Sequence, residues 1–262
     1  AERTHLIEQI KANPKEESNY IALMFLYSES GQDDQALEIA KKLEKEIPSS
    51  DWAQVSLFKY HLAENDGANA VKAMNIVLAS NKIDNKIRHR IMNEFLIFAK
   101  DKPQYEADLQ KAITFFDNDP EVDVAKEIGK FFHTKKDWDK TIKYYSLHLQ
   151  QTPDDLETVY LLFQVYTEQQ KYDVLAQKSE EFLESYPLQP QFYFYAGLAY
   201  NQLKNHKKAK DMLEMGLDYL VDDPQLEMNF NIQLGEAYSA LGDTKKMEQH
   251  FKKADQILKS RK

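Results

Sequence analysis

The side chains able to do chemistry in this chain are seven histidines and several adjacent pairs of carboxylates. No two histidines have the H-E-x-x-H spacing, or another close spacing, that would place both imidazoles on one metal ion. We therefore expect solvated or packing imidazoles, including His89 of the Arg88-His89-Arg90 cluster. Carboxylates at helix starts accept free backbone N–H groups, and we interpret the paired acids as such caps; they are Asp33-Asp34, Asp154-Asp155 and Asp222-Asp223.

The other common devices of catalysis are missing from the sequence. There is no cysteine, which excludes disulfides, thiolate nucleophiles and zinc held by thiolates. The 7 glycines are dispersed, whereas a phosphate-binding loop needs several close together, and no serine lies in a nucleophile-elbow motif. The sequence thus predicts a protein that is not an enzyme and that carries neither a metal nor a cofactor.

Composition limits the partners as well. A hydrophobic content of 42% in 262 residues is enough for a sizeable core, and a net charge of −9 opposes general binding to nucleic acid. The nine non-polar or aromatic residues from Phe192 to Tyr200 fall far short of the roughly 18 that a membrane-spanning helix needs. Residues 245–262 are locally basic, with seven basic and two acidic side chains. We interpret them as a solvated helix, with contact to an anionic surface as the alternative.

Prolines mark the chain at a nearly fixed interval. Pro14 and Pro48 lie 34 residues apart, Pro120 and Pro153 lie 33 apart, and Pro187 follows 34 later. Because proline interrupts helices, stops at such a period indicate a repeated structural unit.

Each unit has the pattern of a helix, a turn and a second helix. In the unit nearest the C-terminus, Leu234, Gly235 and Tyr238 form one stripe, and Phe251 and Ala254 follow on the second helix. The nine-residue stretch repeats the pattern with a stripe of Tyr193, Ala196, Gly197 and Tyr200. Small residues on such a stripe allow two antiparallel helices to approach closely.

These stripes resemble the tetratricopeptide repeat. The resemblance implies an all-α chain folded as a right-handed α-solenoid of helix–turn–helix repeats, forming a single superhelical domain over residues 1–262. We expect a half repeat at 2–16 and seven repeats at about 17–50, 51–84, 89–121, 122–155, 156–189, 190–227 and 228–261. The prolines are the expected repeat ends, Pro224 among them.

The same resemblance implies a binding wall made by the first helix of each repeat. Its predicted positions begin with an apolar zone, in which Phe25, Trp52 and Val55 stand, and continue through Lys59 and Asn93. A basic zone and an aromatic and amide zone follow. From these we expect nine partner-binding residues on the concave face: Lys126, Lys130, Tyr160, Gln164, Phe194, Leu198, Asn201, Asn229 and Ile232.

The predicted function is a non-enzymatic scaffold that binds a peptide or helix of a partner protein in this groove. A partner with acidic residues beside an apolar anchor would fit best. The alternatives are a small-molecule or glycan-binding envelope protein, and an accessory domain of a larger envelope protein or enzyme. The carboxylate clamp of chaperone-binding relatives is not reproduced, because Lys130 and Leu161 stand where asparagines belong. We expect a bacterial periplasmic or envelope location, with the cytoplasm as the alternative, and leave the oligomeric state open.

Overall fold

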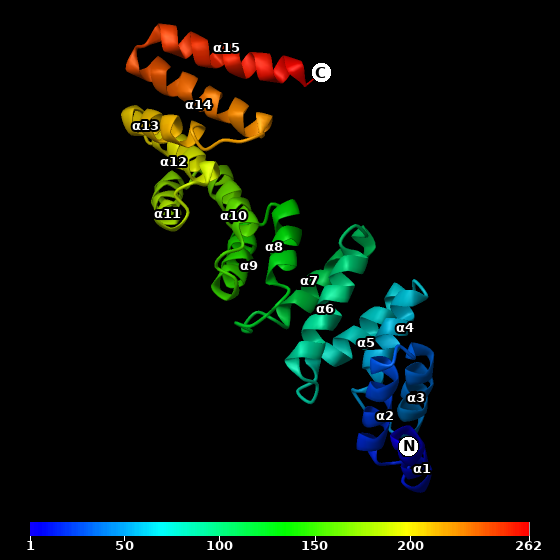
Figure 1. Cartoon of the computed structure of the whole chain (residues 1–262). Helices are drawn as coiled ribbons and strands as arrows, with labels where there is room; N and C mark the ends of the chain where they lie inside the picture. Colours follow the sequence, from blue (N-terminus) through cyan, green and yellow to red (C-terminus); the bar gives the residue numbers. More distant parts are fainter. Residues whose placement is uncertain (262) are drawn as a thin grey trace. The chain divides into compact units, whose positions relative to one another are not determined.

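The computed structural model describes residues 1–261, and this part of the chain contains helices and turns but no strand (Figure 1). The predictions of an all-α fold and of helix–turn–helix repeats are confirmed. Over the same residues, no helix has the length and apolarity needed to cross a bilayer.

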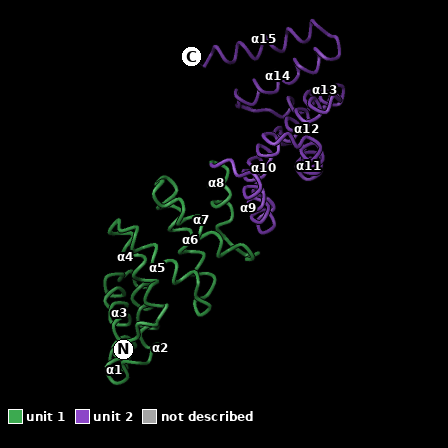
Figure 2. The backbone as a smooth tube through the Cα atoms, turned by 180° about the vertical axis from the view of Figure 1, so that it is seen from behind, with its two compact units in different colours: residues 1–134 green, residues 135–262 purple. Residues whose placement is uncertain are grey.

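The chain divides into two compact units, residues 1–134 and 135–262 (Figure 2). The helices of unit 1 are α1 (Glu2–Ala12), α2 (Glu17–Glu29), α3 (Asp33–Glu46), α4 (Ala53–Ala63), α5 (Gly67–Ala79), α6 (Asn85–Ala99), the short 3₁₀ helix η1 (Pro103–Tyr105), α7 (Glu106–Thr114) and α8 (Ala125–Thr134). Those of unit 2 are α9 (Trp138–Gln151), α10 (Leu156–Glu168), α11 (Tyr172–Ser185), α12 (Pro190–Gln202), α13 (His206–Leu217), α14 (Pro224–Leu241) and α15 (Thr244–Ser260). The predicted repeat 122–155 has its first helix in unit 1 and its second in unit 2.

Side-chain caps fix many of the helix starts. Asp155 and Asp223 accept hydrogen bonds from the backbone N–H groups of Thr158 and Leu226, as expected for these two acidic pairs. Asp84 caps α6 in the same way, so this helix begins at Asn85 and not at the predicted repeat start, residue 89.

Prolines occupy two kinds of position. Pro14, Pro48, Pro153 and Pro187 lie in the turns that follow helices, as the period predicted. Pro224, expected to end a repeat, is instead the first residue of α14. Proline suits the first helical position, because the N–H that it lacks has no partner there. The last repeat therefore starts at 224, four residues ahead of the predicted boundary.

The turns inside the repeats share one backbone conformation. A residue in the left-handed region joins the two helices of most repeats, with φ between 55° and 80°: Gly31, Asn65, Lys136, Gln170, Lys204 and Gly242. In the repeat of α6 and α7, η1 stands in place of this turn.

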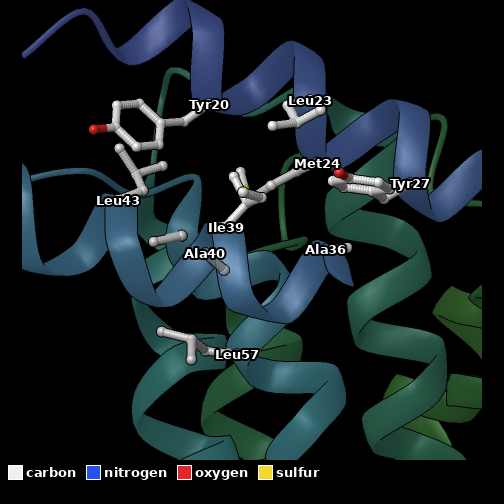
Figure 3. Packing of buried hydrophobic residues seen from close by; sticks show 10 residues of the cluster. Tyr20, Leu23, Met24, Tyr27, Ala36, Ile39, Ala40, Leu43 and Leu57 are labelled. Carbon is white, nitrogen blue, oxygen red and sulfur yellow. The ribbon is translucent and has the colours of Figure 1, made fainter. Parts of the chain in front are cut away.

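The core of unit 1 begins where α2, α3 and α4 pack together. Tyr20, Leu23 and Tyr27 of α2 face Ala40 and other small or apolar residues of α3, and Leu57 joins them from α4 (Figure 3). Because this stripe lies on one side of α2, the opposite side of that helix is left for other contacts.

In unit 2 three residues of the predicted scaffold stripe are buried, and the fourth, Tyr200, is half-buried. Tyr193, Ala196 and Gly197 of α12 are inaccessible or nearly so, and Gly197 lies directly over the side chain of Leu213 on α13. The apolar run from Phe192 to Tyr200 therefore serves helix packing.

Candidate partner-binding groove

A hollow in unit 1 has a volume of about 790 Å³ and is lined by first helices of successive repeats. Residues of α2, α4 and α6 form most of its wall, and α8 contributes near its start. Five of the positions predicted for the binding wall line it: Phe25, Trp52, Val55, Lys59 and Asn93. We call this hollow the unit 1 groove.

Aromatic rings form one part of the groove. Phe25 of α2 lies edge-on to Trp52 at the start of α4, with ring centroids 5.9 Å apart and planes at 68°. Phe25 remains 40% exposed, although its neighbour Met24 is part of the core. Val55, one turn into α4, continues the apolar surface. An exposed phenylalanine packed against a tryptophan offers a preformed seat for another apolar side chain.

Cations and an amide form the opposite part. Arg90 and Asn93 lie one turn apart on α6, and Lys59 faces them from α4. The Nε atom of Arg90 is 4.0 Å from Glu94, and the Nζ atom of Lys59 is 3.8 Å from Asp33, so both ion pairs are loose. Among residues 1–261, the amide of Asn93 has no hydrogen-bond partner.

Two carboxylates along the groove, Asp84 and Asp123, have closer partners inside the chain. Asp84 caps α6, whereas Glu127 lies 3.8 Å from Lys130, as far as Lys59 lies from Asp33. Asp123 approaches Nδ1 of His89 at 3.3 Å. Burial raises the pKa of Glu94, while the charge of Arg90 acts in the opposite direction.

His89 was expected to be a solvated or packing imidazole, and it is a packing one. Its ring is buried, with Nε2 2.7 Å from Asp119 and Nδ1 3.3 Å from Asp123, and it lies 5.5 Å from the ring of Phe116. The imidazole thus ties the segment before α8 to α6. Within the described residues, no group of three or more His, Asp or Glu side chains has the geometry of a metal site.

The residues predicted from the sequence for partner binding fall in both units. Lys126 and Lys130 lie on α8 in unit 1 and are half-buried, whereas the other seven lie in unit 2.

The predicted aromatic ladder consists of rings that lie against the next repeat. Tyr160 of α10 packs on Phe192 of α12 at 5.3 Å, and its hydroxyl is 3.5 Å from Oε1 of Gln189. Phe194 of α12 packs in the same way on Phe230 of α14 at 5.7 Å. Burial raises the pKa of Tyr160 to about 12. Tyr160 and Phe194 are half-buried, so part of each ring serves packing between repeats and part remains on the surface.

The remaining predicted residues have different environments. Gln164 is exposed and acts to lower the pKa of Tyr195, and Leu198 packs partly on the core. Asn229 accepts a hydrogen bond from Gln225 at 3.2 Å, and Ile232 is half-buried.

Asn201 does not belong to a partner-binding surface. Its side chain is only 3% exposed and donates to the backbone oxygen and to Oε1 of Gln233, at 2.9 and 3.0 Å. Its oxygen faces Nδ1 of His206 at 3.0 Å. The side-chain amide is thus fully used in hydrogen bonds, and those to Gln233 join α12 to α14. A buried amide without such partners would destabilise the fold.

The apolar and cationic groove was not selected from the sequence, although its positions had been assigned to the wall. The signal was Phe25 at a wall position, outside the buried stripe of α2, with Trp52 one repeat later. An aromatic ring that the core does not need is a better indicator of a site than a ring in an apolar run.

Comparisons with known proteins agree with the architecture. Residues 229–257 match the family model of the tetratricopeptide repeat. Among solved structures, the C-terminal part of a TPR repeat-containing protein from Cytophaga hutchinsonii is similar, with 17% identity and a TM-score of 0.56, over 90% of this chain and 95% of that one. MamA MSR-1 is similar with 20% identity and a TM-score of 0.50, over 67% of this chain and 99% of that one. MamA RS-1, as a double mutant, gives 18% identity, a TM-score of 0.53 and coverages of 66% and 96%. A comparison with curated proteins gave no match. At these identities the likeness concerns the fold.

Proposed function

Because the chain is built from repeats of the tetratricopeptide type, we propose that it is a non-enzymatic protein-interaction scaffold whose unit 1 groove binds a segment of a partner protein. The segment presents an apolar side chain with a carboxylate beside it. One observation carries this proposal: Phe25 stays exposed against Trp52 on one side of a groove whose other side holds Arg90 and Asn93.

The preference for a carboxylate follows from how the groove's own charges are used. Asp84 and Asp123 are held by a helix cap and by His89, whereas Arg90 and Lys59 have only loose partners. An incoming carboxylate therefore gains a contact with the cations without breaking a close one. The amide of Asn93 can pair with the backbone of an extended segment, which needs both a donor and an acceptor.

The apolar seat supplies most of the affinity in this proposal. Aromatic anchors in well-packed seats dominate protein interfaces, and truncating one typically costs 2 kcal/mol or more. The cations then select the partner and speed its approach, since charges contribute more to specificity and association rate than to affinity.

A small molecule is the second candidate occupant, because about 790 Å³ lies within the roughly 300–1,000 Å³ typical of ligand pockets. The two candidates differ in what they require of the groove. A peptide needs both the apolar seat and the polar side, and it shows a sequence preference.

The test is selection from a random peptide library on the whole protein, followed by titration of the selected peptides. Trp52 lies in the groove, so its fluorescence in a Trp138→Phe background reports occupancy. We expect selected peptides to share an aromatic or large aliphatic residue next to Asp or Glu. Phe25→Ser should weaken them by about tenfold or more, the equivalent of roughly 1.4 kcal/mol.

The matched control is Ile76→Ser on α5, which is 42% exposed and lies outside the groove lining. Arg90→Gln should weaken acidic peptides and leave versions with Asn or Gln in place of the acid unaffected, with Lys72→Gln as its control. Peptides whose affinity is unchanged by Phe25→Ser would refute the groove. A small molecule that shifts Trp52 emission when no peptide does would favour the second candidate.

A further inference from the structure

Unit 2 carries two adjacent blocks of opposite charge. Residues 211–236 hold seven acidic side chains and no Lys, Arg or His, and residues 244–262 hold seven basic and two acidic ones. In the structure the acidic block covers most of α13, the linker to α14 and much of α14 itself. The basic block is α15 and the residues after it, which the sequence had suggested to be a solvated helix.

The two blocks meet at one end of the α14–α15 pair. Arg261 donates a hydrogen bond from Nη1 to Oε1 of Gln225, the second residue of α14. The C-terminal end of α15 thus lies beside the start of α14, which directly follows Asp222 and Asp223 of the acidic linker. Negative and positive groups therefore occupy neighbouring parts of one surface.

Exposed apolar side chains lie on the same parts of the chain. Val221 in the linker is 77% exposed, and Leu258 near the end of α15 is 51% exposed. Tyr219 is exposed too, and its ring is held in place by stacking on Tyr193 at 5.6 Å. Phe251, two turns before Leu258, is 38% exposed, but its ring lies over Gly235 of α14 and therefore serves helix packing. We call this combination the C-terminal surface: the linker 218–223 and the exposed side of α15.

Lysines form a column along the exposed part of α15. Lys245, Lys252 and Lys259 are spaced by seven residues and are all exposed, about 100° around the helix from Leu258. The helix packs along α14 through Ala254, which is buried, and through part of the ring of Phe251. Leu258 and the three lysines remain exposed on unit 2.

We propose that a second copy of this chain binds the C-terminal surface, and that the two copies are related by a two-fold axis. The acidic linker of each copy then lies against the basic side of α15 of the other, and the exposed apolar side chains meet between them. A surface that carries both signs side by side is complementary to itself under a two-fold rotation, which is the requirement for a symmetric dimer. An apolar centre with a charged rim is the ordinary composition of such an interface.

The size of the surface sets the strength of the dimer. A stable interface buries about 1,200–2,000 Å² in total, and a helix of 17 residues is only about 25 Å long. The C-terminal surface lies at the low end of this range, so the dimer should form and dissociate with concentration. It should also weaken with salt, because its rim is charged.

A charge exchange between two variants tests the pairing. The acid variant carries Asp218→Lys and Glu227→Lys, and the base variant carries Lys245→Glu and Lys252→Glu; all four residues are exposed. Alone, each variant places like charges across both halves of the interface and should be monomeric. Mixed in equal amounts, they recover opposite charges at both halves and should form a heterodimer.

The measurement is sedimentation velocity of the full chain over a range of concentrations, at low and high salt, with circular dichroism to confirm that each variant is folded. Lys171→Glu with Lys207→Glu is the control, because both lysines are exposed in unit 2 and the net charge changes by the same amount as in the base variant. We expect wild type and control to dimerise, Leu258→Ser to lose the dimer, and the mixture of acid and base variants to regain it.

Three results would overturn the proposal. These are a wild-type chain that stays monomeric at the highest concentration, a dimer that the variants do not affect, and a mixture that stays monomeric. The competing interpretation is that the basic helix α15 contacts an anionic surface. Vesicles rich in phosphatidylserine that bind a monomeric wild type, but not the base variant, would establish that interpretation instead.

Discussion

Gly197→Ala tests the close approach of α12 and α13 in unit 2. A Cβ atom at position 197 would lie 2.3 Å from Cγ and 2.5 Å from Cδ2 of Leu213. Leu213 is fully inaccessible, so its side chain has no empty space into which it can move. The added methyl group must force either the leucine out of its rotamer or the two helices apart.

Two opposing effects set the magnitude. Overpacking a filled core costs typically 1–3 kcal/mol. Alanine in place of glycine inside a helix contributes about 0.8–1.0 kcal/mol in the other direction. We therefore expect a net destabilisation of about 1 kcal/mol, or a fall in Tm of roughly 2–4 °C for a chain of this size.

Gly235→Ala is the matched control, because it stands at the equivalent position of the next repeat. Its Cβ would lie 2.3 Å from Cε1 of Phe251, but this ring is 38% exposed and can turn outward. The helix propensity of alanine should then prevail, leaving stability unchanged or higher. The two melting curves are compared by circular dichroism. If Gly197→Ala raises the Tm as much as Gly235→Ala does, Leu213 yields without cost and the reasoning is wrong.

Three further predictions concern unit 2. Asn201→Leu should lower the free energy of unfolding by about 1–3 kcal/mol in urea denaturation, because the buried side chain and backbone oxygen of Gln233 lose their donor. The pKa of Tyr195 is raised to about 12 by burial, so the folded chain keeps a proton that the unfolded chain releases near pH 10. The free energy of unfolding should therefore fall between pH 10 and 12, and it should fall less in the Tyr195→Phe variant. Equal pH dependence of the free energy of unfolding in the two proteins would contradict this prediction. Phe194→Ala should cost roughly 1–3 kcal/mol of stability through its contact with Phe230, less than for a fully buried ring, and an unchanged denaturation midpoint would show that the contact contributes nothing.

The helical repeats could be predicted because their signals are local. Proline positions and the stripe of Tyr193, Ala196 and Gly197 depend on residues within one or two turns, where helical spacing is fixed. The start of α14 escaped prediction, because Pro224 is equally suited to ending one repeat and to beginning the next helix.

The site was harder to predict, because exposure depends on distant partners. Asn201 has the sequence position of a wall residue, yet its amide is used by Gln233, 32 residues further along the chain. Helical periodicity places a residue on a face but does not show what lies opposite. Phe25 and Trp52 illustrate the converse, since only the packing of α2 beside α4 shows that both rings border a hollow.

The left-handed turns are positions at which the stability of this protein can be increased. Lys136, Gln170 and Lys204 adopt a conformation that costs an L-residue roughly 1–2 kcal/mol and that glycine adopts freely, although glycine loses more entropy on folding. These turns belong to three successive repeats. Replacements by glycine at separate sites should add nearly independently, each giving a fraction of a kcal/mol up to about 1. The thermal stability of the chain can therefore be raised at these turns, away from both proposed binding surfaces, and a triple glycine variant should have a higher Tm.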